Sequence, residues 1–377
     1  MQTNKLAEHI SAHAWNADHT QVAICPNNNE IVIFEITEKG PVEKHKLLKH
    51  DQHVSAIDWC HETNNIVSCS HDRSAYVWTF ADGIWSPELV ILPINRAALS
   101  VAWSPNGTKF VVTSGQHCVC ICHRDTRSTE WWVSRRTDHP SMAESVTAAA
   151  WHPNGIVCAC GGMNGKVLLF AAVMKGVDKR PTEAVYGFGP PIRFPQPLIE
   201  LDVTDGAWIQ DIAFSPSGDE LMIVTGDAKV RFVTLSADQP CPVATVTLTS
   251  EAMLAAVYIN ETAAIATGYN AEPLLFTKDA EGWAMRKSLD PKKGNAEIGG
   301  GPKKPRSAAF AKFEAAAASS GKAESAMKSK GVQTVHRNTV PSIRLVDGGV
   351  VSTAGLDGVL VQWKLGEGEV AELIMAM

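Results

Sequence analysis

The chain has 377 residues, of which 45% are hydrophobic and 20% are charged, and its formal net charge at pH 7 is −6. This composition excludes a chain that is disordered overall, because it supplies enough apolar side chains for a large core. The sequence has no apolar run long enough to span a bilayer and no N-terminal signal pattern, and its acidic balance disfavours a nucleic-acid binder. We therefore expect a cytoplasmic protein with no membrane insertion and no nucleic acid among its partners.

A repeat of about 44 residues runs through the chain. In each of the first five units, an aromatic residue that ends one strand is followed 13 positions later by a turn residue. In all seven units, an apolar residue that ends the next strand comes six positions after the turn residue. The aromatic positions are Trp15, Trp59, Trp103, Trp151 and Phe214, and the apolar positions are Phe34, Trp78, Cys122, Phe170, Val233, Phe276 and Trp363.

Each unit is a series of short strands joined by tight turns. Apolar residues alternate with small or polar ones, and motifs such as Trp103-Ser-Pro-Asn-Gly107 separate the runs. A helical solenoid would require apolar residues at helical spacing, which these segments lack. Four short strands in about 44 residues are typical of a propeller blade. We therefore expect an all-β fold, a seven-bladed WD-repeat β-propeller that occupies residues 1–377 as a single domain.

The second unit contains a Ser/His/Asp set that resembles a catalytic triad. It consists of His50, Ser68 or Ser70, and Asp72, with Trp78 beside them. WD-repeat blades use such a set structurally: the His donates to the turn Asp, and the hydroxyl bonds both the His and the Trp N–H. We interpret the set as a buried polar network and not as a catalytic site.

Two adjacent tryptophans, Trp131 and Trp132, follow in the third unit. Neighbouring residues on a strand point to opposite faces, so the two indoles cannot both lie in the core on one blade face. We expect one of them at a blade surface. There it either packs against the adjacent blade or anchors a protein interface, since Trp is enriched at binding hot spots.

Two departures from the period locate insertions. The spacing from Trp151 to Phe214 is 63 residues, and the excess falls around Lys175–Val203, which is rich in proline and glycine. We expect this stretch to form a loop between the fourth and fifth blades. The larger insert covers residues 286–335, between the sixth and seventh blades.

The larger insert differs from the rest of the chain in charge. Residues 291–330 carry a net charge of +6, so the remainder carries −12. Residues 307–318 have high helix propensity and place two phenylalanines on one face. We expect a flexible basic arm whose short helix binds a partner; the alternative is a linker whose phenylalanines fold back on the propeller. The predicted partner-binding residues of this arm are Lys303, Lys304, Arg306, Phe310, Lys312 and Phe313.

The seventh unit repeats the polar set of the second, with His336, Asp357 and Trp363. A set that recurs at the same blade position has a structural role, so we expect no catalytic residues there. The chain also lacks a G-x-S-x-G elbow, a P-loop and a C-x-x-C pair, and its nine cysteines fit buried positions in strands. These features predict a protein that is not an enzyme and has no cofactor and no metal site.

Motifs more specific than the repeat extend over nearly the whole chain. They include His13-Ala-Trp-Asn16, Asn64-Asn-Ile-Val-Ser-Cys69, Ile94-Asn-Arg-Ala-Ala98 and Trp131-Trp-Val-Ser134. In these motifs the chain resembles one WD-repeat family, subunit 1 of the actin-related protein 2/3 complex. The step Lys312-Phe-Glu314 also looks like part of the helix in that family's long loop.

The resemblance implies a non-catalytic scaffold subunit that supports the nucleation of branched actin filaments. Its propeller would bind the actin-related proteins and small helical subunits of the same complex. Its insert helix would contact the actin of the mother filament or the activator, so the implied partners include the actin filament and WASP-type nucleation-promoting factors. The implied location is the cytoplasm, at the actin cytoskeleton.

Two other functions compete with this one. A WD-repeat adaptor of another multiprotein machine, such as a ubiquitin-ligase substrate receptor, would usually present a ring of basic residues on its central surface. The turn residues show no such ring. A propeller hydrolase would require carboxylates or histidines that converge on the central channel, which sequence spacing does not reveal.

Overall fold

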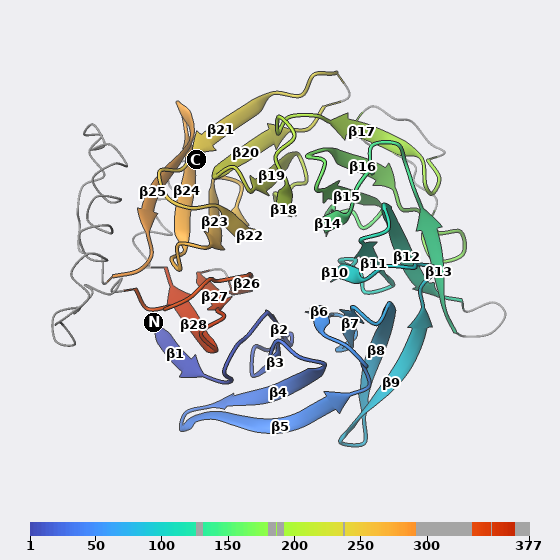
Figure 1. The fold of residues 1–377 in the computed structure, drawn as a ribbon, viewed down its shortest axis with the longest axis vertical. Coiled ribbons are helices and arrows are strands. Elements are labelled where there is room, and N and C mark those ends of the chain that lie inside the picture. Colours follow the sequence, from blue (N-terminus) through green and yellow to red (C-terminus); the bar gives the residue numbers. More distant parts are fainter. Residues whose placement is uncertain are drawn as a thin grey trace, which may run out of the picture.

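The protein folds into seven four-stranded antiparallel sheets arranged as blades around a common axis (Figure 1). The computed structural model describes residues 1–125, 131–179, 186, 192–236, 238–291, 334–347 and 349–365. Every regular element in these residues is a strand, which confirms the predicted all-β, seven-bladed propeller.

The first four blades follow the chain order, and each runs from its innermost to its outermost strand. Blade 1 consists of β2 (Ala12–Trp15), β3 (Gln21–Cys25), β4 (Glu30–Thr37) and β5 (Gly40–Leu48). Blade 2 consists of β6 (Val54–Trp59), β7 (Ile66–Ser70), β8 (Ser74–Ala81) and β9 (Ile84–Ile91). Blade 3 consists of β10 (Ala98–Trp103), β11 (Lys109–Ser114), β12 (Cys118–Arg124) and β13 (Trp132–Thr137). Blade 4 consists of β14 (Val146–Trp151), β15 (Val157–Gly162), β16 (Val167–Ala171) and β17 (Pro197–Leu201).

The last three blades complete the ring. Blade 5 consists of β18 (Ile209–Phe214), β19 (Glu220–Thr225), β20 (Lys229–Thr234) and β21 (Val243–Thr247). Blade 6 consists of β22 (Met253–Asn260), β23 (Ala263–Gly268), β24 (Leu274–Asp279) and β25 (Gly282–Ser288). Blade 7 consists of β26 (Ser342–Asp347), β27 (Val350–Ala354), β28 (Val359–Lys364) and, from the start of the chain, β1 (Gln2–Lys5).

The ring closes through the pairing of β1 with β28. The two strands are antiparallel, with Gln2 opposite Gln362 and Lys5 opposite Val359. The start of the chain therefore supplies the outer strand of the last blade, which leaves no gap between blades 7 and 1 (Figure 1). The sequence had left this pairing open.

The hydrophobic core is a ring of seven clusters, and each cluster lies between two consecutive blades. The second strand of each blade is buried along nearly its whole length, as in β11 and β19. The outer strands alternate instead, because one face packs inward and the other faces solvent, as in β21. A blade therefore cannot bury its apolar faces alone and is stabilised by both neighbours.

The predicted turns join the first and second strands. Gly107 and Gly155 adopt positive φ values of 65° and 69°. At Gly107 a Cβ atom would lie 2.5 Å from the Sγ atom of Cys60, so a side chain there would clash with blade 2. Glycine is required at this turn both for its backbone conformation and for the close approach of the neighbouring blade.

Both insertions differ in position from their predictions. The excess around Lys175–Val203 lies within blade 4, between β16 and β17, and not between blades 4 and 5 as expected. The expectation was wrong because the fourth strand of this blade comes after the insertion. The larger insert begins after β25, which extends to Ser288, so its predicted start at residue 286 was too early.

Candidate interaction surfaces and buried polar networks

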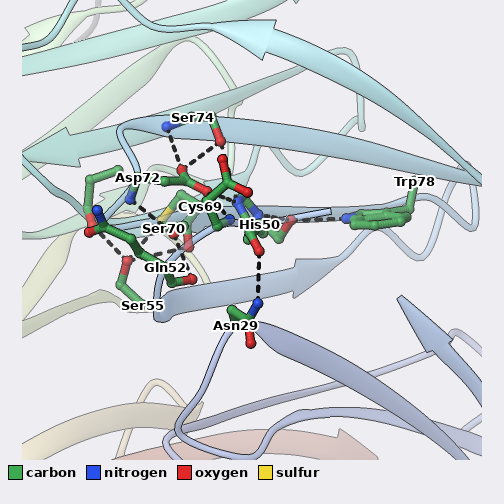
Figure 2. Close-up of polar contacts among 12 residues, drawn as sticks. Asn29, His50, Gln52, Ser55, Cys69, Ser70, Asp72, Ser74 and Trp78 are labelled. Carbon is green, nitrogen blue, oxygen red and sulfur yellow. Dashed lines mark hydrogen bonds and ion pairs between the residues drawn. The ribbon is translucent and has the colours of Figure 1, made fainter. Parts of the chain in front are cut away.

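Blade 2 brings the predicted polar set into one hydrogen-bonded line (Figure 2). The Nδ1 atom of His50 lies 2.9 Å from Oδ2 of Asp72, and its Nε2 atom lies 2.8 Å from Oγ of Ser68. The indole N–H of Trp78 donates to the same hydroxyl at 2.9 Å. If Nδ1 carries the proton, it donates to the carboxylate and Nε2 accepts from Ser68, so each group is satisfied.

The electrostatics of this set are those of a structural network. Burial lowers the pKa of His50, although Asp72 acts in the opposite direction. Burial alone would raise the pKa of Asp72, but hydrogen bonds from Ser74 and His50 hold it below its ordinary value. Ser68 is fully buried and already accepts from Trp78, so no substrate can reach its hydroxyl. The arrangement satisfies buried polar groups and does not activate a nucleophile.

Blade 7 repeats this geometry with a threonine. The Nδ1 atom of His336 lies 3.2 Å from Oδ1 of Asp357, and its Nε2 atom lies 2.8 Å from Oγ1 of Thr353. The indole of Trp363 donates to the threonine hydroxyl at 2.8 Å. Sequence reasoning missed Thr353, although it stands four positions before Asp357, as Ser68 does before Asp72.

A further network joins blades 1 and 7, and no sequence pattern indicated it. The two ring nitrogens of His13 lie 2.8 Å from Oγ of Ser342 and 2.7 Å from Oγ of Ser352. Trp15 donates to Ser352 at 2.9 Å. His13 is completely buried, and this burial, followed by the charge of Arg344, lowers its pKa well below the ordinary value. These bonds reinforce the closure of the ring.

The two adjacent tryptophans of the third blade differ in burial. Trp132 packs edge-to-face on Trp103, with 5.7 Å between the ring centroids, and also contacts Phe110 in the core between blades 2 and 3. Trp131 is 71% exposed. Trp131 is therefore the one that reaches the surface.

Most of the exposed large apolar side chains lie on the outer strand of blade 1, on the two outer strands of blade 2, or directly before β13 in blade 3. Ile91 is the most exposed of them, at 76%. The other members of this surface, which we call the outer apolar surface, are Val42, Leu48, Phe80, Ile84, Leu89 and Trp131. Such a concentration on one part of a propeller rim is typical of a protein-binding surface.

Comparison with known proteins shows which family has this fold and these motifs. Residues 42–79 and 133–170 match the family model of the WD domain, G-beta repeat; each match covers the last strand of one blade and the first three of the next. Subunit 1B of the actin-related protein 2/3 complex from Arabidopsis thaliana is 38% identical over 376 residues, which cover 97% of this chain and 96% of that protein. Subunit 1A-A of the complex from Xenopus laevis is 34% identical over 364 residues, covering 95% and 94%, respectively.

The chain belongs to the family of actin-related protein 2/3 complex subunit 1. A fungal member, from Schizosaccharomyces pombe, is 30% identical over 367 residues, covering 94% of this chain and 96% of the relative. Membership in this family confirms the resemblance seen in the sequence and the prediction that the chain is not an enzyme.

The remaining predicted sites stand as follows. All six predicted residues of the insert, from Lys303 to Phe313, and the helix expected over residues 307–318 lie outside the described residues. In the part of the chain that the structure describes, no group of three or more His, Cys, Asp or Glu residues is arranged to hold a metal ion. Nor is any helix there long and apolar enough to cross a bilayer.

Proposed function

We propose that this protein is a non-catalytic scaffold subunit of the actin-related protein 2/3 complex and supports the nucleation of branched actin filaments. In this role the propeller binds the actin-related proteins and the small subunits of the complex, in the cytoplasm at the actin cytoskeleton. The names of relatives that match over nearly the whole chain support this proposal. They also favour it over a role as adaptor of another multiprotein machine.

The observation that carries the scaffold role is the outer apolar surface. Among the described strands β9 pairs with β8 alone, so its other edge carries backbone groups that no described strand pairs with. Leu89 and Ile91 project exposed apolar side chains from this edge strand. An exposed apolar edge promotes aggregation in a monomer and is normally covered. A permanent partner subunit provides that cover.

We propose that a groove beside this surface receives a helix of a partner subunit. It lies between β5 and β9 and has a volume of about 420 Å³. Leu48, Ile84, Trp85 and Pro87 line it, together with lysines of β5. An amphipathic helix can insert apolar side chains into such a groove while an acidic residue on its flank meets Lys49, since Lys44 and Lys46 already pair with Glu35 and Glu43. The groove thus suits a helical subunit with an acidic flank.

Copurification tests the docking surface. We expect the double substitution Leu89→Asp and Ile91→Asp to abolish capture of the actin-related proteins and small subunits by the tagged full-length chain. Both side chains face solvent, so the circular dichroism spectrum and melting temperature of the isolated chain should change little. Val243→Asp, at an exposed position on the outer strand of blade 5, is the matched control. Full capture by the double variant would refute docking through this surface.

We propose that the basic insert reaches beyond the complex to mother-filament actin or to a WASP-type nucleation-promoting factor. Its net charge of +6 suits an acidic surface, and actin is acidic. We expect Phe310→Ala combined with Phe313→Ala to leave assembly of the complex intact but to reduce branch formation. Branches are counted by fluorescence microscopy of actin filaments. Loss of assembly would instead show that these phenylalanines belong to a core.

A further inference from the structure

A cleft of about 630 Å³ lies between the outer part of blade 3 and the segments that connect β16 to β17 in blade 4. Its wall on blade 3 includes His123 from β12 and Arg135 from β13. Lys175 and Arg193, from the connecting segments, form the opposite side. The lining of the cleft shares no residue with the groove between β5 and β9 or with the outer apolar surface.

The floor of the cleft is fixed by a buried ion pair. Lys109 and Asp178 form a salt bridge, and their side chains are 0% and 3% exposed. Lys109 also donates to the carbonyl of Ala172 at 2.8 Å, and its ammonium lies 5.3 Å from the ring centre of Trp151. These contacts hold the connecting segment against blade 3. They also neutralise Asp178, the one acidic side chain among the described residues that line the cleft.

Three cations at the cleft lack an anionic partner. Within the described residues, Arg135, Lys175 and Arg193 form no salt bridge and no side-chain hydrogen bond. The remaining arginine of the lining, Arg136, pairs with Asp138 at 3.1 Å. Three unpaired cations face one nearby carboxylate, Asp125, which lines an adjoining hollow with His123, Arg135 and Lys175. Among the described residues the local charge is therefore positive and attracts anions.

His123 provides an independent indication of a ligand. Its side chain lines the cleft, the residue is only 8% exposed, and its Nδ1 atom is buried without a hydrogen-bond partner. Burial, followed by the charge of Arg135, lowers its pKa, so the imidazole is neutral at pH 7. Nδ1 is not exposed to solvent in this structure, so the ring must turn towards the cleft before a neutral imidazole can donate a hydrogen bond from Nδ1 to an anionic oxygen. A buried polar atom left without a partner destabilises the protein unless a ligand satisfies it.

We propose that this cleft binds a small molecule that carries several phosphate groups. Its volume falls in the range of small-ligand sites, and Val173, Met174, Ile192 and Phe194 supply an apolar lining for the body of such a molecule. Guanidinium groups pair with phosphate oxygens through two parallel hydrogen bonds, and lysine adds a point charge. A soluble inositol polyphosphate and a phosphoinositide headgroup share this chemistry.

Isothermal titration of the full-length chain with inositol hexakisphosphate tests the site. We expect saturable binding that weakens with added salt, since the contacts are ionic. The double variant Arg135→Ala and Arg193→Ala should lower the affinity by about tenfold or more, because two of the three unpaired cations are lost. The control, Arg96→Ala with Arg337→Ala, removes two exposed charges elsewhere and should bind as the native chain does. Equal affinity in both double variants would overturn the proposal.

A second variant separates binding from folding. His123→Phe keeps an aromatic ring but removes the unpartnered nitrogen, so we expect a higher melting temperature without ligand and a smaller increase when inositol hexakisphosphate is added. An unchanged increase would show that His123 does not contact the ligand and would overturn the assigned geometry.

Vesicle cosedimentation distinguishes the two sources of phosphate. Pelleting with phosphatidylcholine vesicles only when they contain phosphatidylinositol bisphosphate, and release by inositol hexakisphosphate, would assign a membrane headgroup. Binding of the soluble compound without pelleting would assign a free ligand. Binding of polyglutamate but of neither phosphate probe would overturn the proposal in favour of an acidic peptide.

Discussion

Blades 2 and 5 anchor the same turn aspartate in different ways. In blade 2, Asp72 accepts from His50, which comes from the connection before the blade. In blade 5, the equivalent Asp227 accepts at 2.8 Å from Arg231, which lies on the third strand of its own blade. Arg231 also donates to the carbonyl of Thr204 in the preceding connection. In both blades the donor links the turn aspartate to the connection before the blade. The donor is a neutral imidazole in blade 2 and a buried guanidinium in blade 5.

This difference shows what the repeat requires. The turn aspartate must be satisfied and the preceding connection must be held, but the donor can come from either side of the turn. The charge of the donor then sets how each blade responds to substitution and to pH. The predictions below probe this contrast, from the largest expected effect to the smallest.

The largest effect is expected in blade 5. Arg231→Leu removes a cation that is only 2% exposed, together with its bonds to Asp227 and Thr204, and leaves Asp227 with Lys229 and Thr225 as partners. Breaking such a pair costs about 3 kcal/mol of unfolding free energy. Urea denaturation followed by fluorescence measures the loss. Arg286→Leu, which breaks an exposed pair with Asp279, should change the stability little, because solvent screens such a pair. Equal costs would mean that burial does not distinguish the two pairs.

A smaller loss is expected from the histidine of blade 2. His50→Ala removes the bonds to Asp72 and Ser68 and leaves a cavity next to Tyr76, whose ring centre lies 4.9 Å from the imidazole. We expect a cost of about 2–3 kcal/mol, from one unsatisfied hydroxyl and the lost packing. The same denaturation experiment applies. A cost above that of Arg231→Leu would reverse the proposed order of the two blades.

Loss of the Ser68 hydroxyl in blade 2 should reduce the free energy of unfolding by less than the loss of His50 does. Ser68→Ala removes the acceptor for Trp78 and the partner of His50 but creates almost no cavity. The expected cost is about 1–2 kcal/mol. Ser86→Ala, at an exposed position on β9, is the matched control and should change stability by less than about 0.5 kcal/mol. Similar values for the two variants would argue against a buried network.

Mild acid should weaken blade 2 before blade 5. The pKa of His50 is lowered from 6.5 by burial, so the folded state resists its protonation and loses stability as the pH falls below 6.5. Buried His13 acts in the same direction. Burial alone would raise the pKa of Asp227. Hydrogen bonds from Arg231 and Thr225 outweigh this effect and lower the pKa from 3.8 to about 2. Its contribution is therefore lost only as the pH falls from 3.8 towards 2.

Melting temperatures at pH 7 and pH 5 check this order. We expect the native chain to lose stability over this interval, and His50→Gln to lose less, because it has one titrating group fewer. Arg231→Leu should lose as much as the native chain does. A smaller decrease of the melting temperature in Arg231→Leu would show that a group of blade 5 titrates between pH 7 and pH 5, which would contradict the range given above for Asp227.

Local patterns in the chain determined the blades. The spacing from Trp15 to Phe34 and its counterparts set seven units, because alternation and turn residues act over a few positions and need no distant contact. The position of His50 relative to Asp72 and Trp78 determined the polar network for the same reason. The corresponding set in blade 7 was also readable, except for Thr353, whose hydroxyl type differs from that of Ser68.

Only the tertiary structure decided how the ring closes and where its surfaces lie. β1 pairs with β28, and His13 bonds Ser342 and Ser352, between residues that lie at opposite ends of the sequence. The insertion within blade 4 and the cleft that Lys109 and Asp178 hold in place depend likewise on contacts between blades. Such pairings depend on which faces meet once the chain is compact, and a pattern of neighbouring residues carries no information about that.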